Sequence, residues 1–347
     1  MEPTESLESS DINDENVLKT IQELIVTCGG ESDTFEAELV KQMIQSSLRM
    51  LTEGHDLGQL KLIARALKEL RYAYYIFNQY PHTQRVSIFG SARTPEDHPD
   101  YQAAKEFSHQ MVAAGWLSIT GAANGIMKAG LEGHLKEQGF GLSIRLPFES
   151  GANTLIEGNH KLIIFRYFFT RKLMFMSHSH AVTAFPGGFG TMDELFEVLT
   201  LLQTGKANIL PVVLLEGKNG TYWNGFEENI HKQFLANGWI SQDDLHFYYK
   251  APSIEAAVAH IQQFYKRYHS SRYVKDVLVI RLKETLTIEQ VEFLNNKYRS
   301  LIQTGVMALC EPFPEEKEFL ELPRLSFTHT RNNFGRVRAL IDDINAF

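Results

Sequence analysis

The stretch that most constrains the fold of this chain runs from Ala181 to Leu195 and reads AVTAFPGGFGTMDEL. Its first residues are apolar or strand-forming, which predicts a short buried strand. Pro186 ends that strand, and the glycines that follow let the backbone turn tightly and approach a ligand closely. Thr191 then begins a helix with an apolar face. A strand, a glycine turn and a helix in this order are typical of an α/β fold.

The helix that follows this turn predicts an anion site. The first amides of a helix have no partner within it, and the helix dipole is positive at that end, so a phosphate can bind there. We expect the phosphate at Gly187, Gly188, Gly190 and Thr191. Glu194 lies a turn inside the helix, close to the expected position of the phosphate's sugar. Thr191 and Glu194 also have the spacing of a capping box, and spacing alone favours that structural role over catalysis.

Composition and charge exclude several functional classes. The chain has 347 residues, of which 44% are hydrophobic and 22% charged, as in an ordinary globular protein. The net charge of −8 argues against binding to a nucleic-acid polymer. No apolar run approaches the ~18 residues of a membrane span, and the acidic N-terminus has no signal-peptide core. Because Cys28 and Cys310 follow no metal-ligand spacing, we expect a cytoplasmic protein with reduced thiols and no metal.

The order of strand-like and helix-like segments predicts the domain organisation. Between residues 82 and 268 the two types alternate, which indicates a Rossmann-like, doubly wound and mostly parallel sheet. Strands are expected at 86–89, 116–120, 141–146, 181–185 and 209–215. The other parts are a disordered acidic tail (1–15), a helical N-terminal segment (16–81), a linker (269–272) and a small α+β C-terminal unit (272–347). The C-terminal unit contains no recognisable catalytic motif.

Glycine turns follow three of these expected strands, so all three should lie at one edge of the sheet. The first carries Ser91, which either binds the ligand or caps its own turn. The second reads GAANG and supplies Gly121 and Asn124 as possible ligand contacts. That turn is neither a dinucleotide fingerprint nor a P-loop, because no Gly-Lys-Ser/Thr follows it.

A pair of cations lies in an unusually apolar segment, FFTRKLMFM. Arg171 and Lys172 could belong to a solvated helix face, but most of their neighbours are aromatic or aliphatic. A guanidinium in such surroundings needs an anionic partner, since an unpaired buried charge costs several kcal/mol. A phosphate or Glu194 would serve.

Two of these segments together carry a family resemblance. The run PGGFGTMDE, with Arg171-Lys172 upstream, resembles the signature of the LOG proteins, and the likeness extends from about residue 86 to 215. It implies a long bacterial form of a nucleotide 5′-monophosphate phosphoribohydrolase, which releases a free base and ribose 5-phosphate. It also implies that Glu194 and Arg171 are catalytic, that Glu149 and Asn153 line the sugar and base, and that the protein pairs as a homodimer or larger closed assembly.

The reaction implied by this resemblance requires no cofactor, and the expected ligand is a nucleoside 5′-monophosphate such as AMP. The alternative is a non-catalytic module that binds or senses nucleotides, which the same sheet could support. Lysine decarboxylation, an older description of the family, would need pyridoxal phosphate on a Schiff-base lysine, and no such arrangement can be assigned. The preferred base cannot be read from these motifs.

Overall fold

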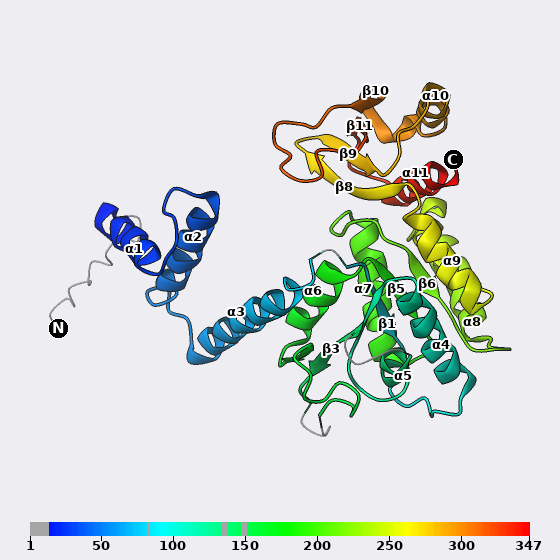
Figure 1. Ribbon diagram of the computed structural model, residues 1–347, viewed down its shortest axis with the longest axis horizontal. Helices are drawn as coiled ribbons and strands as arrows, with labels where there is room; N and C mark the ends of the chain where they lie inside the picture. The colour runs from blue at the N-terminus through cyan, green and yellow to red at the C-terminus, as the bar shows by residue number, and fades with distance from the viewer. Residues whose placement is uncertain (1–13, 82, 134–137, 147–150) are drawn as a thin grey trace. The chain divides into compact units, whose positions relative to one another are not determined.

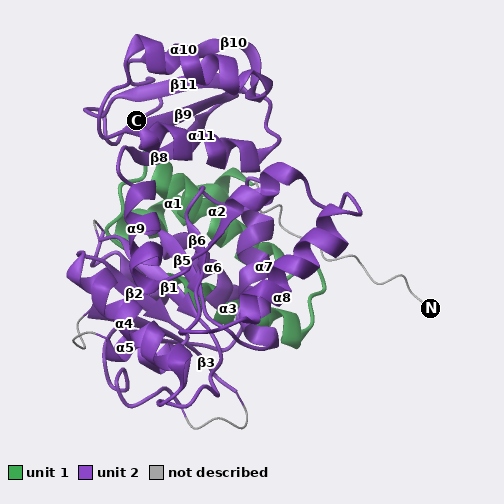
Figure 2. Ribbon diagram, turned by 90° about the vertical axis from the view of Figure 1, so that its right-hand side faces the viewer, with its two compact units in different colours: residues 1–71 green, residues 72–347 purple. Residues whose placement is uncertain are grey.

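The computed structural model describes residues 14–81, 83–133, 138–146 and 151–347. They form two compact units, which meet in sequence between Arg71 and Tyr72 (Figure 2). Residues 1–13 of the expected tail and Glu149 lie outside the described residues. Asp14 and Glu15, which were expected to belong to the tail, are helical in setting, because Asp14 accepts the amide of Asn16 at 2.8 Å and caps a helix that starts at Glu15.

The first unit confirms the helical N-terminal segment. Its helices are α1 (Glu15–Thr27), α2 (Phe35–Arg49) and most of α3 (Leu57–Phe77), which continues into the second unit. Thr34 caps α2 by accepting the amide of Ala37. Large apolar side chains remain exposed on this unit, among them Phe35, Leu39, Met43, Leu51 and Leu57.

A seven-stranded parallel sheet forms the centre of the second unit (Figure 1). Its strands are β1 (Arg85–Phe89), β2 (Leu117–Thr120), β3 (Gly139–Ile144), β4 (Leu162–Phe165), β5 (Ala181–Ala184), β6 (Val212–Leu214) and β7 (Tyr248–Lys250). The spatial order is β4-β3-β2-β1-β5-β6-β7, and every neighbouring pair is parallel. The predicted doubly wound, Rossmann-like sheet is therefore confirmed.

Helices cover both faces of this sheet. They are α4 (Pro99–Ala113), α5 (Ile126–Glu132), α6 (Phe168–His178), α7 (Phe189–Gln203), α8 (Tyr222–Asn229) and α9 (Ile254–Phe264), with a π-helix at Ile230–Leu235 and the 3₁₀-helix η3 at Gln242–Phe247. Ile88 packs into a core with Phe107 of α4, whereas its neighbour Phe89 meets Phe175 of α6 with ring centroids 4.8 Å apart. Successive strand residues point to opposite faces, so α4 and α6 lie on opposite sides.

The chain order creates a crevice between β1 and β5. From β1 the chain builds outward through β2, β3 and β4, and it then returns to β5 on the other side of β1. Ligands of doubly wound sheets bind at this type of switch point, outside the carboxyl ends of the strands. The fold therefore brings the turns after β1 and β5 together.

A four-stranded antiparallel sheet forms the C-terminal part of the same unit. Its elements are β8 (Tyr268–Val274), β9 (Val277–Leu282), α10 (Ile288–Lys297), β10 (Ile302–Cys310), β11 (Arg324–His329) and α11 (Phe334–Ala346). The predicted linker at 269–272 is wrong, because these residues pair with β9 inside β8. The side chain of Asn345 fixes this connection by accepting the amides of Arg267 and Tyr268 and donating to the carbonyl of Phe264.

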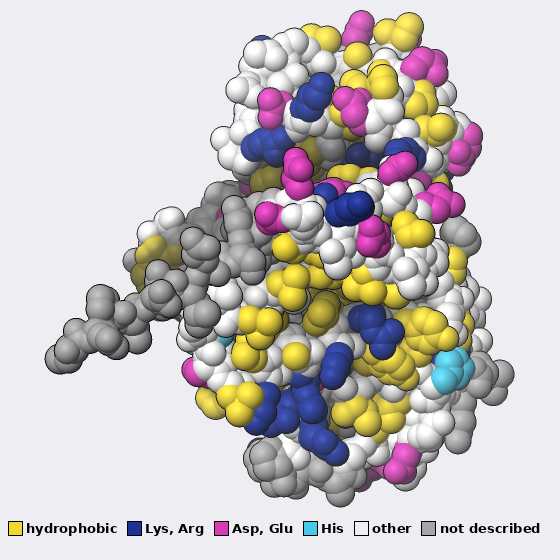
Figure 3. All heavy atoms as spheres, turned by 90° about the vertical axis from the view of Figure 1, so that its left-hand side faces the viewer, with side chains coloured by type: hydrophobic (Ala, Val, Ile, Leu, Met, Phe, Trp, Pro, Cys, Tyr) yellow, Lys and Arg dark blue, Asp and Glu magenta, His cyan; other side chains and the backbone are white. Residues whose placement is uncertain are grey.

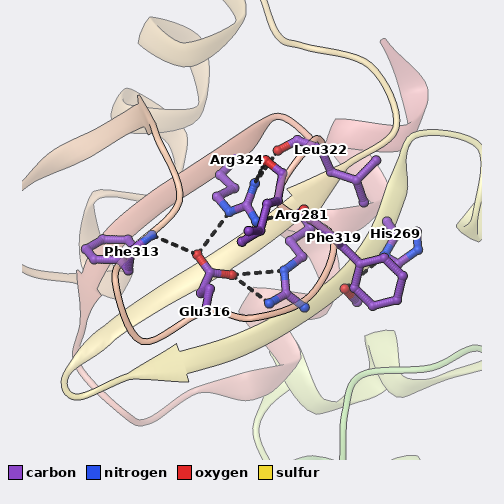
Figure 4. Close-up of polar contacts among 9 residues, drawn as sticks. His269, Arg281, Phe313, Glu316, Phe319, Leu322 and Arg324 are labelled. Carbon is purple, nitrogen blue, oxygen red and sulfur yellow. Dashed lines mark hydrogen bonds and ion pairs between the residues drawn. The ribbon is translucent and has the colours of Figure 1, made fainter.

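A buried carboxylate holds the loop between β10 and β11 on this sheet (Figure 4). Glu316 accepts hydrogen bonds from Arg281 at 2.6 and 3.0 Å and from Arg324 at 3.0 Å. Burial opposes its ionisation, but these hydrogen bonds outweigh burial and lower the pKa of Glu316. Removing one partner from such a group costs about 3–5 kcal/mol, so Glu316 is a structural residue of the C-terminal sheet.

Candidate active site

The turns after β1 and β5 contact each other directly. The amide of Ser91 donates to the carbonyl of Pro186 at 3.1 Å. A Cβ atom on Gly187 would lie 2.1 Å from Thr191 Oγ1 and 3.0 Å from the Ser91 amide nitrogen, so only glycine fits there. The two turns therefore form one wall of the crevice at the switch point.

This wall presents unused amides to open space. Helix α7 starts at Phe189, with Gly188 as its N-cap and no side-chain cap. The amides of Gly187, Gly188, Phe189 and Gly190 donate to no acceptor among the described residues. A Cβ atom on Gly188 or Gly190 would meet no atom within 4 Å. The turn thus has the free donors and the room that an anion needs, although the Thr191 amide donates to the carbonyl of Gly188 instead.

The early start of α7 removes the capping-box interpretation of Glu194. Thr191 was expected to begin the helix, but it is already the third helical residue, and Glu194 is the sixth. Glycine supplies the N-cap, because Gly188 adopts an extended conformation at φ −92° and ψ −153° that needs no side chain. The carboxylate of Glu194 is therefore available for another role.

Arg171 contacts β3 and the turn after β2. It is 8% exposed, and its Nε donates to the carbonyl of Leu142 at 2.9 Å. A Cβ atom on Gly121 would lie 2.6 Å from Arg171 Nη2, so the guanidinium packs against the turn after β2. The guanidinium also lies over the ring of Phe175, 5.2 Å from its centroid. The predicted buried setting of this cation is therefore present.

Lys172 connects α6 to three carboxylates of α7. Its Nζ lies 2.5 Å from Glu197, 3.0 Å from Asp193 and 3.7 Å from Glu194. Burial alone would lower the pKa of Lys172, but the hydrogen bonds that it donates to Glu197 and Asp193 raise that pKa above its ordinary value. Lys172 is thus not part of a solvated helix face.

Glu194 is buried between these two cations and the body of α7. The residue is 7% exposed. Burial raises the pKa of its carboxyl above the ordinary value, and the charges of Arg171 and Lys172 oppose this rise without cancelling it. A desolvated carboxylate beside an open, donor-rich turn is a common arrangement in active sites, where pKa values are shifted by burial and nearby charge.

Two further predicted contact residues, Asn153 and Asn124, lie at the GAANG turn after β2. Asn153 donates to the carbonyls of Ala122 and Ala123 at 3.0 and 2.9 Å and accepts the amide of Leu155, so its side chain holds the GAANG turn. In that turn Ala122 has φ +60°, a conformation that favours glycine. Asn124 is exposed beside it.

Ser91 caps its own turn. Its hydroxyl accepts the amide of Arg93 at 3.1 Å, which is the structural role that the sequence left open. The hydroxyl hydrogen is still available to a ligand, because a serine oxygen can accept and donate at once.

The turn also has a partner that the sequence motifs did not indicate. The hydroxyl of Tyr222, the first residue of α8, donates to the carbonyl of Gly187 at 2.6 Å. Only the packing of the loop after β6 against the turn after β5 reveals this contact.

Other titratable groups near this region belong to the packing of the fold. Burial lowers the pKa of His178 and of His180 to about 4, and the His178 ring stacks on Phe77 at 3.8 Å. Among residues 14–347, outside the three short undescribed gaps, no group of histidines, cysteines and carboxylates is placed to hold a metal ion. The same described residues contain no helix long and apolar enough to cross a bilayer.

A shallow groove of about 670 Å³ runs along the outer face of α7. Its lining combines Lys172, Asp193 and Glu197 with Phe189, Met192 and Phe196. Phe189 is 98% exposed at its end. Figure 3 shows a face of the molecule on which apolar side chains gather around lysines and arginines. Apolar surface of this kind marks interaction sites on soluble proteins.

Comparison with known proteins finds relatives of this region. Residues 110–261 match a family described as "Possible lysine decarboxylase". The cytokinin riboside 5′-monophosphate phosphoribohydrolase LOG1 of Arabidopsis thaliana is 36% identical over 98 residues, which cover 28% of this chain and 44% of that protein. LOG4 of the same plant is 34% identical over 94 residues, covering 27% and 42%. The chain thus spans less than half the length of these curated relatives.

Solved structures that resemble about half of this chain include two molybdenum-cofactor proteins. The carrier protein of Chlamydomonas reinhardtii is 20% identical, with a TM-score of 0.37 over 52% of this chain and 98% of the carrier. The binding protein of Rippkaea orientalis is 17% identical, with a TM-score of 0.38 over 52% and 97%. The assignment of the fold class rests on the strand order described above.

Proposed function

We propose that this protein, whose central domain is similar to LOG phosphoribohydrolases, hydrolyses the N-glycosidic bond of nucleoside 5′-monophosphates. The products would be a free base and ribose 5-phosphate. The observation that carries the proposal is the junction of the turns after β1 and β5. It offers unpaired amides to an anion, and a buried carboxylate lies within the first two turns of the same helix.

The proposed reaction is the addition of water to the anomeric carbon. The C1′–N bond breaks, its electron pair leaves with the base, and the water oxygen forms the new bond to C1′. One proton of that water replaces the ribose on the base, so no further reactant is needed. Bond breaking leaves positive charge on the ribose, as in other glycoside hydrolyses. Glu194 would stabilise this charge and position or deprotonate the water.

The cations beside Glu194 support its ionised form. Arg171 and Lys172 both favour the carboxylate, against the desolvation that favours the acid. The bond from Arg171 to Leu142 and its contact with Gly121 fix the guanidinium near the crevice. This geometry favours orientation of Glu194 and neutralisation of charge as the role of Arg171. The phosphate bound at the α7 turn would fix the ribose against Glu194.

The proposal includes a closed homo-oligomer, at least a dimer. Three large side chains of α6 are about half exposed: Phe168 at 50%, Phe169 at 52% and Leu173 at 46%. Together with the groove along α7 they give an apolar surface beside the site, which a second copy of the chain could cover.

The test is an assay of the intact protein with a panel of nucleoside 5′-monophosphates, in which free base is measured by chromatography. We expect base release from monophosphates and at least ~100-fold lower kcat/KM for the same nucleosides without phosphate, because a lost charged anchor is worth ~2–4 kcal/mol. Equal turnover of adenosine and AMP would show that the 5′-phosphate does not contribute to substrate recognition. Nucleotide binding without any base release would support the non-catalytic alternative.

A further inference from the structure

The glycine turn between β5 and α7 uses its carbonyl oxygens and leaves its amides unused. The carbonyl of Pro186 accepts the amide of Ser91 at 3.1 Å, and that of Gly188 accepts two amides of the first helical turn, both at 3.1 Å. The carbonyl of Gly187 is bound by a side chain, the hydroxyl of Tyr222, at 2.6 Å. Each carbonyl from 186 to 188 is thus engaged by the protein.

The bond to Tyr222 sets the direction of a neighbouring amide. In a planar trans peptide the N–H points opposite to the C=O. Because the carbonyl of Gly187 points to the Tyr222 hydroxyl, the amide of Gly188 points away from it. Glycine at 188 would tolerate rotation of this peptide by half a turn, since positive φ costs glycine little. That rotation would remove a donor from the anion site and replace it with a carbonyl dipole of the wrong sign.

Tyr222 itself is held by the loop that follows β6. Its amide donates to Glu216 Oε2 at 2.8 Å. Its ring meets the buried ring of Trp223 edge-on, with centroids 4.9 Å apart, and Trp223 Nε1 donates to the carbonyl of Leu215 at 3.0 Å. The loop therefore holds the backbone of Tyr222 beside the glycine turn.

We propose that Tyr222 is a positioning residue of the anion site, whose hydroxyl keeps the Gly187–Gly188 peptide in the orientation that binds a phosphate. The identity of the ligand as the phosphate of a nucleotide rests on the proposed function. The action of Tyr222 does not depend on whether the bound compound is cleaved.

The experiment compares Tyr222→Phe with Tyr249→Phe, which removes a hydroxyl from β7 while leaving a ring that stacks on His260. The affinity for ribose 5-phosphate is measured by titration calorimetry. KM and kcat are measured with AMP as the substrate, and the melting temperature is measured by scanning calorimetry. We expect Tyr222→Phe to bind ribose 5-phosphate about tenfold more weakly and to raise KM by a similar factor, as for one lost hydrogen bond that supports a charged ligand. Tyr249→Phe should match the wild type.

The outcomes separate this inference from the proposed function. Wild-type ribose 5-phosphate affinity in Tyr222→Phe would overturn the role of Tyr222, even while the wild type hydrolyses AMP. If Tyr222→Phe binds ribose 5-phosphate more weakly and the wild type releases no base, the result would support the role of Tyr222 and contradict the proposed hydrolase activity. If Tyr222→Phe loses several degrees of melting temperature and regains wild-type affinity well below the transition, the bond is only structural and the inference is wrong.

Discussion

Glu194 lies in an environment that disfavours its own charge. It lies inside a helix without serving as its cap, it is 7% exposed, and burial raises its pKa despite two nearby cations. A buried carboxylate kept in such a place lowers the stability of the fold at neutral pH. Strained or destabilised groups of this kind are common where function requires them.

We predict that Glu194→Gln separates activity from stability. Glutamine keeps the shape of the side chain and removes the charge, so the fold is relieved of a desolvated carboxylate, and the melting temperature should equal or exceed that of the wild type. Loss of a preorganised electrostatic partner should slow turnover of AMP by ~100-fold or more. Calorimetric melting and base release measure the two effects.

Glu197→Gln is the matched control, because Glu197 also contacts Lys172 but lies further along α7. We expect it to lower kcat only a few-fold. If Glu194→Gln hydrolyses AMP at a near-normal rate, or if both variants lose the same activity, Glu194 is not the catalytic carboxylate.

The raised pKa of Glu194 also predicts a pH dependence. The folded state binds this proton more tightly than the unfolded chain, whose glutamates titrate near 4.3. Glu194 therefore favours folding below about pH 4.3 and loses that contribution as the pH rises through its folded pKa. The melting-temperature gain of Glu194→Gln should accordingly be larger at pH 7 than at pH 4.

The kcat of the wild type should fall as the pH drops through the same raised pKa, at a higher pH than an ordinary glutamate would give. A kcat that stays constant down to pH 4.5 would contradict this assignment.

At the level of residues, the motifs of the sequence predicted which side chains lie near one another, and their roles at the site stay predictions. Arg171, Lys172 and Glu194 were expected to gather at the site, and the structure brings them together. The roles of Asn153 and Tyr222 could not be predicted, because each is defined by a backbone carbonyl far away in sequence. Such partners depend on tertiary packing and leave no local pattern.

At the level of elements, the position at which α7 starts determines which glycines of the turn have room for a side chain. Gly187 has no room for a side chain, whereas Gly190 faces open space inside a helix. Glycine weakens a helix by roughly 0.5–1 kcal/mol relative to alanine. A glycine at position 190 is thus better explained by the space that a ligand needs than by the stability of the helix.

We predict opposite effects for the two alanine substitutions. Gly187→Ala should lower the melting temperature, because its Cβ would lie 2.1 Å from Thr191 Oγ1. Gly190→Ala should melt at or above the wild-type temperature but bind ribose 5-phosphate at least ~10-fold more weakly, because the methyl group fills space next to the amides. Calorimetry measures both quantities. Unchanged affinity in Gly190→Ala would place the anion elsewhere.

The elements that the sequence predicted are those with a strong pattern between clear breaks. The strands expected at 86–89 and 116–120 match β1 and β2 to within a residue. By contrast, β4 lies in a long apolar run that continues into α6, where periodicity cannot separate strand from helix. The polar segment of β8 is a strand only because β9 pairs with it.

At the level of the whole molecule, the C-terminal helix α11 packs against α7, the helix that carries the candidate site. The same helix also packs against α9 and η3. A Cβ atom on Gly205, just beyond the end of α7, would lie 2.1 Å from the ring of Phe334 in α11. Arg338 of α11 is 2% exposed and donates to Asp342 at 3.0 Å. Its guanidinium carbon lies over the ring of Phe264, 4.7 Å from the ring centroid. This part of the chain contributes structure beneath α7, which the sequence could not indicate without knowing the packing.

The apolar face of α6 predicts the state of assembly. A single copy leaves Phe168, Phe169 and Leu173 about half exposed, so we expect a homodimer or larger closed oligomer at micromolar concentration. Phe169→Glu should shift the mass measured by light scattering toward the monomer, because an apolar interface cannot bury an unpaired carboxylate. The control is Ile288→Glu, on α10, where the natural side chain is 75% exposed and the same charge is added far along the chain. It should leave the mass unchanged. A monomeric wild type would contradict the proposed assembly, and a Phe169→Glu variant with the wild-type mass would show that α6 is not its interface.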